Sequence, residues 1–531
     1  MTLADGRVRT APGASGTAHR TAVLVGAVLA QLMIVMDMTI VSVALPSMQA
    51  GLGFSDSDRQ WVVTAYTLSF GSLVLFGGKL SQVLGVKRAY VIAIVGFGLA
   101  SLAGGLSQGI GMLLAARAVQ GAFAGLLAPT NLSLISTTFV EPASRAKVFA
   151  VFGATGGAGA AVGMLLGGVL TEYLDWRWCL FVNVAVAIGA SAVFSRAFSG
   201  VVSGGSGQRL LGDVPGLLLG CGGVFSFVYG FSEAGRSHWG SAATISWLVA
   251  GAVCALLFVV RERAASDPLL PLWIVWNPGR AASYFVMAMG GWFQMGGLLY
   301  LSYFFQDHLG YSAARTGVAF LPLIGGLIVA AIVTNRVLVP RAGIRVVFPL
   351  GLVVAAAGFW LFTGITTGSN YGGGLLAGLV VTGFGLGIVF APAFSAGSRG
   401  VPAEHNGLAN AALSTSQQVG ASFGVAFLST FAIQHATDLL RGQTAAIEAE
   451  VATALAAAHV LPTSAQGQNI ANHVVATHTA AAEVSAYAAG FQVLTVAAAA
   501  AAALLVVAGA VLGARRARGR SNSLAPVGPS R

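Results

Sequence analysis

The sequence predicts an all-α integral membrane protein that crosses the bilayer fourteen times. Only 8% of its 531 residues are Asp, Glu, Lys or Arg, against about 25% in a typical soluble domain, and 56% are apolar. Its mean hydropathy is +0.81. Apolar runs recur along the chain, each near the roughly 20 residues that a helix needs to cross a hydrocarbon core about 30 Å thick. This composition excludes a water-soluble enzyme and a disordered chain, and the 72 glycines follow no collagen period.

The apolar runs fall into three groups. Six spans are predicted near residues 21–43, 59–80, 89–107, 110–137, 146–170 and 178–199. Two more lie near 213–231 and 243–260, and the last six near 281–303, 316–337, 345–365, 372–397, 406–434 and 488–513. The first run is too long for a cleaved signal peptide and has Asp37 in its middle, so we expect it to remain as a span.

The one long connection lies at about 437–487, between the last two spans. It is Ala-rich with weak helical character, and we predict an extracellular loop. His435 stands near its start, and His459, His473 and His478 follow. Scattered histidines in a polar loop are typical of a solvated surface, so we expect no metal site here.

The placement of basic residues predicts the topology. With both termini in the cytoplasm, 22 of the 28 Lys and Arg residues fall inside, five fall outside, and Arg117 stays within the membrane. Ten acidic residues fall outside. The net charge of +11 therefore reflects topology and does not indicate nucleic-acid binding. We expect the protein in the plasma membrane, and the sequence is compatible with a monomer.

Several kinds of chemistry lack their motifs. Lys79 follows Gly77 and Gly78 but precedes Leu80, so it completes no ATP-binding phosphate loop. No HExxH, clustered His and Cys set or repeated potassium-filter sequence occurs. We therefore expect no enzymatic activity, no cofactor and no metal.

Two ionisable residues lie clearly at membrane depth, Asp37 in the first span and Arg117 in the fourth. A charge there costs about 2.5–3.5 kcal/mol on insertion scales, so each is a functional candidate. One interpretation is a buried structural ion pair. The other is that Asp37 takes up and releases a proton, because separation from the Arg117 guanidinium in a desolvated site favours the protonated carboxyl.

Small residues mark the fifth span. Gly159, Gly163 and Gly167 recur at steps of four, and Gly168 stands beside them. Such a stripe allows another helix to approach backbone to backbone.

Aromatic and amide residues mark two later spans. Trp292, Tyr300 and Tyr303 belong to an aromatic-rich ninth span, and Asn410, Gln417 and Gln418 form a polar stripe on the thirteenth. Such side chains either pack against neighbouring helices or line a pathway, and the sequence leaves both interpretations open. We take all six as candidates for the lining of a cavity.

Five stretches match motifs that occur together in one family. The first span reads DMTIVSVALP from Asp37 to Pro46, with Ser42 where Asn is usual. The loop after the second span has Gly78, Leu80, Gly85, Lys87 and Arg88, with Gln82 where Asp is usual. The fourth span carries R-x-x-Q-G at Arg117, Gln120 and Gly121. The fifth carries the glycines named above, with Met164 where Pro is usual. Residues 175–184 read DWRWCLFVNV, and the motif positions in this stretch are Trp176, Arg177, Trp178, Phe181 and Asn183.

Together these motifs resemble the major facilitator superfamily, and within it the fourteen-span branch of drug:proton antiporters. The resemblance covers roughly residues 21–513 and implies two six-helix bundles with a cavity between them. The implied domains are a cytoplasmic tail at 1–20, a first bundle at 21–200, a linker with two extra spans at 201–280, a second bundle at 281–513 that includes the loop 437–487, and a cytoplasmic tail at 514–531.

The resemblance also implies roles. It assigns proton coupling to Arg117, and it places Gly159, Gly163 and Gly167 at the interface between the bundles, where they limit leak. Other motif residues are expected to serve gating: Gly78, Gly85, Lys87, Arg88, Gln120, Gly121 and Gly168. Gln82 lacks the charge of the family's acidic relay residue, and Met164 lacks the proline that kinks the fifth helix.

We expect proton-coupled export of a small amphipathic drug or antibiotic by alternating access, with Asp37 as the proton carrier. One carboxylate at mid-membrane offers little compensation to a dication, so neutral or monocationic aromatic substrates are expected. One alternative is an exporter or symporter of a metabolite such as a peptide, siderophore or amino acid. Another is a non-transporting sensor or scaffold, against which Asp37 and Arg117 argue, because a scaffold would gain stability by losing both.

Overall fold

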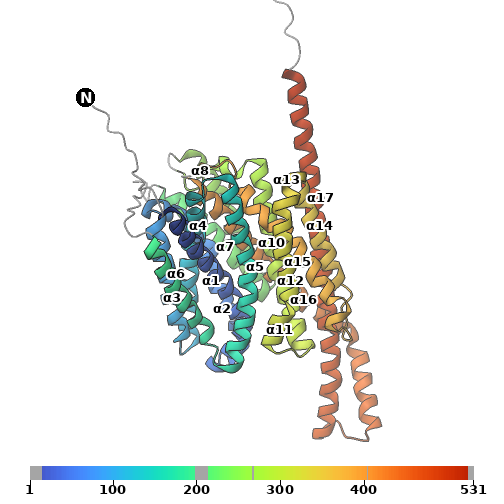
Figure 1. The fold of residues 1–531 in the computed structure, drawn as a ribbon. Coiled ribbons are helices and arrows are strands. Elements are labelled where there is room, and N and C mark those ends of the chain that lie inside the picture. Colours follow the sequence, from blue (N-terminus) through green and yellow to red (C-terminus); the bar gives the residue numbers. More distant parts are fainter. Residues whose placement is uncertain (1–14, 198–212, 266–267, 403–404, 524–531) are drawn as a thin grey trace, which may run out of the picture.

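The structure is a computed structural model that describes residues 15–197, 213–265, 268–402 and 405–523 (Figure 1). All the regular elements in those ranges are helices. Among the described residues, eleven helices are long and apolar enough to cross a membrane, and Val162–Tyr173 and Trp178–Phe194 form shorter apolar helices. The predicted all-helical membrane fold is confirmed, and the count of fourteen spans stays a prediction. Most of the predicted N-terminal tail, the start of the linker at 201–212 and the end of the C-terminal tail lie outside the described residues.

The first group of helices comprises α1 (Ser15–Leu52), α2 (Asp56–Leu84), α3 (Val86–Gly105), α4 (Ile110–Thr138), α5 (Pro142–Tyr173) and α6 (Trp178–Ala197). Helix α1 packs against α5 and α6, α2 packs against α4, and α3 packs against α4 and α6. Gly85 alone links α2 to α3 with φ of +78°, in the region that favours glycine. The motif glycine is therefore required by a one-residue turn.

Helices α7 (Val214–Ser237) and α8 (Ala242–Ala264) pack against each other, and α7 also contacts α2 and α16. The second group follows. It comprises α9 (Leu272–Val275), α10 (Pro278–Tyr303), η1 (Phe304–His308), α11 (Ala313–Ala319), α12 (Leu321–Val333), η2 (Thr334–Leu338), α13 (Val339–Ala342), α14 (Ile344–Phe362), η3 (Tyr371–Leu375), α15 (Leu376–Gly397), α16 (Asn406–Ala457) and α17 (Ala465–Ser523). The predicted span at 316–337 is thus built from several consecutive short helices.

The segment 437–487, predicted as a loop, is helical. Helix α16 continues to Ala457 and α17 starts at Ala465, so the connection is a helical hairpin that projects beyond the bundle (Figure 1). Helix α16 has 52 residues, which at about 1.5 Å per residue span roughly 78 Å, more than twice the hydrocarbon core. The segment is Ala-rich, and alanine has the highest helix propensity, so the helices persist where the hydropathy falls.

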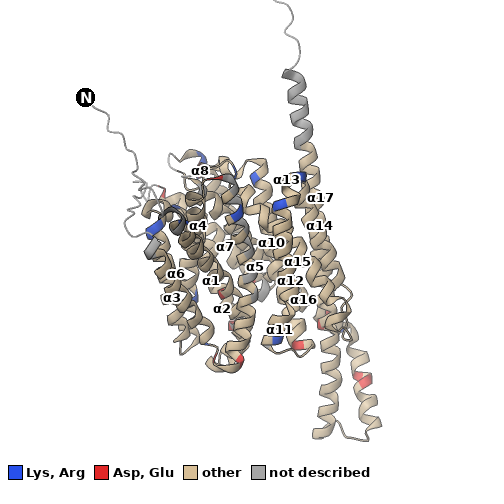
Figure 2. Cartoon of the chain, in the orientation of Figure 1, with Lys and Arg blue, Asp and Glu red and all other residues tan. Residues whose placement is uncertain are grey.

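Charged residues separate along the long axis of the molecule. Figure 2 shows most Lys and Arg toward the end that carries α13, whereas acidic residues mark the hairpin and the neighbourhood of α11 at the opposite end. This separation matches the charge bias read from the sequence.

The two groups of helices touch at both ends. At the end of the bundle where the α2–α3 turn lies, a Cβ placed on Gly78 would lie 3.1 Å from the Cβ of Ala411 on α16. At the other end, a Cβ on Gly317 of α11 would lie 3.0 Å from the backbone of Met164 on α5. Glycine permits both close approaches, because any larger residue would push the helices apart.

Candidate functional site

Asp37 and Arg117 form a buried ion pair between α1 and α4. Arg117 Nη1 donates to Asp37 Oδ2 at 2.6 Å, and the residues are 0% and 1% exposed. The sequence separation is 80 residues, so helix packing alone brings the two charges together. The structure therefore places both sequence-predicted charges in one site.

Three more polar side chains complete this site. Gln120 Nε2 donates to Asp37 Oδ1 at 2.8 Å and to Ser101 Oγ at 2.7 Å, and its Oε1 accepts from Arg117 Nη1. Asn183 of α6 donates to Asp37 Oδ1 at 2.7 Å. The carboxylate thus accepts hydrogen bonds from three side chains, which together stabilise its anionic form.

The contact between α4 and α2 holds the guanidinium in place. A Cβ on Gly121 would lie 2.3 Å from the carbonyl oxygen of Tyr66, so only glycine allows this approach. Arg117 then lies with Cζ 4.4 Å from the centre of the Tyr66 ring, and its Nε donates to the Val62 carbonyl. The R-x-x-Q-G motif is a local unit in which the arginine pairs, the glutamine bridges and the glycine sets the helix distance.

The glycine stripe of α5 packs against α1. Cβ atoms on Gly159, Gly163 and Gly167 would meet the following groups: Val35 at 3.1 Å, Thr39 Oγ1 at 2.0 Å and Ile40 at 3.1 Å. These three glycines therefore contact a helix of their own group, and the expectation that they form the interface between the bundles is wrong for them. Gly168 is also buried. On the same helix the backbone of Met164 contacts Gly317 of the second group, and α5 runs through that position as one continuous helix.

Four of the predicted gating residues lie at or near the α2–α3 turn. Gly78 faces α16, Gly85 makes the turn, Lys87 is half-buried and Arg88 is exposed. Gln82, in the position of the usual acid, is half-buried on the last turns of α2.

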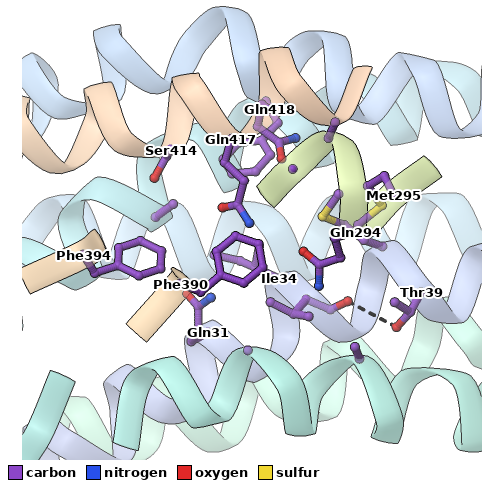
Figure 3. A pocket seen from close by; sticks show the side chains of 18 of the residues that line it. Gln31, Ile34, Thr39, Gln294, Met295, Phe390, Phe394, Ser414, Gln417 and Gln418 are labelled. Atoms are coloured by element: carbon purple, nitrogen blue, oxygen red, sulfur yellow. Dashed lines mark hydrogen bonds between the residues drawn. The ribbon is translucent and has the colours of Figure 1, made fainter. Parts of the chain in front are cut away.

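A cavity lies between the two groups of helices, with a volume of about 110 Å³ (Figure 3). Its polar lining consists of Gln31, Thr39, Gln294, Ser414, Gln417 and Gln418. Its aromatic lining consists of Phe70, Phe152, Phe390 and Phe394. Pockets that hold drug-sized ligands usually measure roughly 300–1,000 Å³, so the helices must separate further to admit one.

Of the six residues predicted for the cavity, the structure brings Gln417 and Gln418 to its wall. The other four lie elsewhere. Trp292 packs with Phe423 and Phe427, and the Tyr300 hydroxyl donates to the carbonyl of Leu428.

The remaining two candidates also lie away from the cavity wall. Tyr303 is 36% exposed, and Asn410 is fully buried. Trp292 and Tyr300 therefore pack against neighbouring helices, which is one of the two interpretations that the sequence left open.

Sequence reasoning missed several residues of the cavity. Gln31, Phe390 and Phe394 were not identified, although a glutamine in an apolar span six positions before Asp37 was a signal for Gln31. The phenylalanines gave no signal, because aromatic residues are common throughout these spans. Among the described residues, no group of three or more His, Cys, Asp or Glu could hold a metal ion.

Helix α1 separates the ion pair from the cavity. Gln31, Ile34, Val35, Met38 and Thr39 line the cavity, whereas Asp37 points toward α4 and α6. One helix therefore carries the buried carboxylate on one side and cavity residues on another.

Comparison with solved structures identifies the fold. The chain aligns with a bacterial homologue of the human lysosomal transporter Spinster at a TM-score of 0.56, with 14% identity over 92% of this chain and 97% of that one. It aligns with tetrameric PepTSo2 at a TM-score of 0.54, with 15% identity over 94% of this chain and 99% of that one. At these identities the likeness concerns the fold alone.

Sequence comparison identifies the family. The chain is 44% identical to the puromycin resistance protein pur8 of Streptomyces alboniger, over 77% of this chain and 80% of that protein. It is 36% identical to the cephamycin export protein CmcT of Amycolatopsis lactamdurans, over 78% and 86%. Residues 27–425 match the family model of the Major Facilitator Superfamily. The chain therefore belongs to the Major Facilitator Superfamily, a class of membrane transporters that carry small molecules rather than a class of enzymes.

Proposed function

We propose that this protein exports amphipathic drugs or antibiotics in exchange for protons by alternating access. The observation that carries the proposal is the buried Asp37–Arg117 pair, which lies one helix away from a cavity between two groups of helices. Relatives named for puromycin resistance and cephamycin export support drug efflux as the transport reaction. The export runs across the plasma membrane, with both termini in the cytoplasm.

Asp37 is the proposed proton carrier. In the described arrangement Arg117, Gln120 and Asn183 all donate to its carboxylate and stabilise the anion. A shift of α1 against α4 would lengthen these hydrogen bonds, and a carboxyl left buried without them binds a proton. Because α1 also lines the cavity, substrate binding and proton binding act on the same helix.

The two halves perform the alternation. The domain at 21–200 and the domain at 281–513 rock against each other around the cavity, and the contacts at Gly78 and Gly317 open in turn. Gly78, Gly85, Lys87 and Arg88 serve as the gate at the cytoplasmic end. The helices of 201–280 lie against α2 and α16 through α7.

The test is drug accumulation and proton movement in proteoliposomes, with Asp37→Asn against the wild type and puromycin as the first probe. The wild type should accumulate drug when an outward-directed proton gradient (acidic interior) is imposed, and an imposed drug gradient should drive protons the other way. Asp37→Asn should lose gradient-driven accumulation by at least about tenfold and keep drug–drug exchange, which needs no proton. Asp175→Asn, an exposed aspartate paired with Arg177, is the matched control and should behave as the wild type.

Two results would contradict the proposal. Gradient-driven accumulation that survives in Asp37→Asn would remove Asp37 from the mechanism. Wild-type drug transport without any proton movement would remove antiport itself.

A further inference from the structure

Over its described residues, the lining of the cavity is uncharged. None of the described residues that line it is Asp, Glu, Lys, Arg, His, Cys or Tyr. The nearby Asp37 carboxylate faces away and is already paired with Arg117, Gln120 and Asn183. An ion transferred from water into such a site loses hydration without gaining a counter-charge.

In place of charge, the cavity has carboxamides. Gln31 comes from α1, Gln294 from α10, and Gln417 and Gln418 from α16, so both groups of helices contribute. Figure 3 shows the amides of Gln31, Gln294 and Gln417 extending into the space around Phe390 from different sides. Each carboxamide offers two hydrogen-bond donors and one acceptor oxygen.

One of these amides has an unused donor. Gln418 is 5% exposed, and its Nε2 is buried without a hydrogen-bond partner among the described residues. Buried polar atoms are nearly always hydrogen-bonded, so this donor is available to a molecule in the cavity.

The amides stand on a rigid part of the wall. A Cβ on Gly291 of α10 would lie 2.2 Å from the carbonyl oxygen of Gln417, and one on Gly420 would lie 1.9 Å from that of Ala288. The backbones of α10 and α16 are therefore in direct contact where the amides project. Phe390 and Phe394 supply flat apolar surface on the facing wall.

We propose that the cavity selects uncharged substrates that combine a flat apolar ring with hydrogen-bond donors and acceptors, and that Gln417 and Gln418 determine this specificity together with Gln31 and Gln294. The proposal rests on the transport function proposed above and narrows its substrate class. It excludes organic cations as preferred substrates, because Asp37, the acidic residue described on the cavity-lining helix α1, is already paired with Arg117.

The test is equilibrium binding to the full-length protein in lipid nanodiscs at pH 6, without any proton gradient. The probes are radiolabelled puromycin, whose amine is protonated at this pH, and its N-acetyl derivative, in which acetylation removes that charge and leaves the ring system unchanged. We expect the uncharged derivative to bind at least about tenfold more tightly. Tetraphenylphosphonium, a permanent aromatic cation without hydrogen-bonding groups, should not compete.

Variants assign the selectivity to the amides. Gln417→Leu and Gln418→Leu should each weaken binding of the uncharged probe by about tenfold, and Gln417→Glu should raise affinity for the cationic probe. Gln306→Leu is the matched control, because Gln306 bonds to Ser302 outside the cavity. Its binding should equal that of the wild type, and thermal unfolding of each variant checks that it folds.

Equal or tighter binding of the cationic probe, or no binding of the uncharged one, would overturn the proposal. So would unchanged affinity in both leucine variants. These outcomes are separate from those of the transport test. A protein that prefers the uncharged probe but moves no protons would support the specificity and contradict the antiport function. A protein that exchanges drug for protons but does not prefer the uncharged probe would support antiport and contradict the specificity.

Discussion

At the scale of single residues, the Asp37–Arg117 pair is not explained by stability. Burying two charges costs several kcal/mol per ion, and their attraction offsets this only when geometry and hydrogen bonds are favourable. Here the pair is 2.6 Å apart, and its remaining groups bond to Gln120, Asn183 and Val62. Even such pairs can often be replaced by apolar residues without loss of stability.

This argument gives a prediction for Arg117→Leu. The single substitution should lower the free energy of unfolding by about 3–5 kcal/mol, because it leaves the Asp37 carboxylate buried without its counter-charge. The double variant Asp37→Leu with Arg117→Leu should recover most of that loss yet transport no drug against a gradient. Thermal unfolding in detergent and accumulation in proteoliposomes measure the two effects.

A double variant that remains as unstable as the single one would show that the pair is needed for folding. One that still concentrates drug would show that the pair is not needed for coupling. The exposed pair of Arg177 and Asp175 provides a control, since its removal should change stability by less than about 1 kcal/mol.

At the scale of helices, the spacing of the glycines predicted that a close helix contact forms, but it did not predict which helix makes that contact. Steps of four from Gly159 to Gly167 correctly indicated a close helix contact, but that contact is with α1 and not with the other bundle. A glycine pattern shows that a backbone can approach, and it carries no information on which helix approaches. The hairpin was missed for another reason: hydropathy reports burial in lipid and not helix formation, so its fall at residue 437 did not mark a helix end.

The α1–α5 contact predicts the effect of Gly163→Ala. Its Cβ would lie 2.7 Å from the carbonyl oxygen of Met36, a backbone atom that cannot rotate away. The substitution should therefore lower stability by about 1–3 kcal/mol and slow transport, because α1 must shift to make room. Thermal unfolding and initial transport rates provide the measurement.

Gly189→Ala on α6 is the matched control, because a Cβ there would meet nothing within 4 Å. It should be neutral or slightly stabilising. Equal unfolding temperatures for the two variants would contradict the tight contact between α1 and α5.

At the scale of the whole molecule, the motifs predicted the fold and the location of the ion pair, but only part of the cavity. Asp37, Arg117 and Gln120 stand out because polar residues are rare at membrane depth. The cavity wall is assembled from eight helices, and residues such as Phe390 and Ala128 reach it only through tertiary packing. No local pattern encodes that convergence.

Alternating access predicts that joining the halves at one end stops transport. Gly78→Cys and Ala411→Cys, with Cys179, Cys221 and Cys254 replaced by Ala, would place two thiols where Cβ atoms lie 3.1 Å apart, close to the roughly 3.5–4.5 Å of a disulfide. Oxidation should block drug accumulation, and a reducing agent should restore it. Each single cysteine variant should be insensitive to the oxidant, and full transport with the disulfide formed would show that this end need not open.

The hairpin of α16 and α17 also has a consequence for imaging. A transporter inside a lipid disc offers few features for aligning particles, but this one has a protrusion at one end (Figure 1). Helix α16 runs without a break from Gln418 at the cavity to Ala457 on the hairpin. An antibody fragment raised against the hairpin would therefore serve as a fiducial held in fixed register with the cavity wall, and would report the tilt of α16 in each state of the cycle.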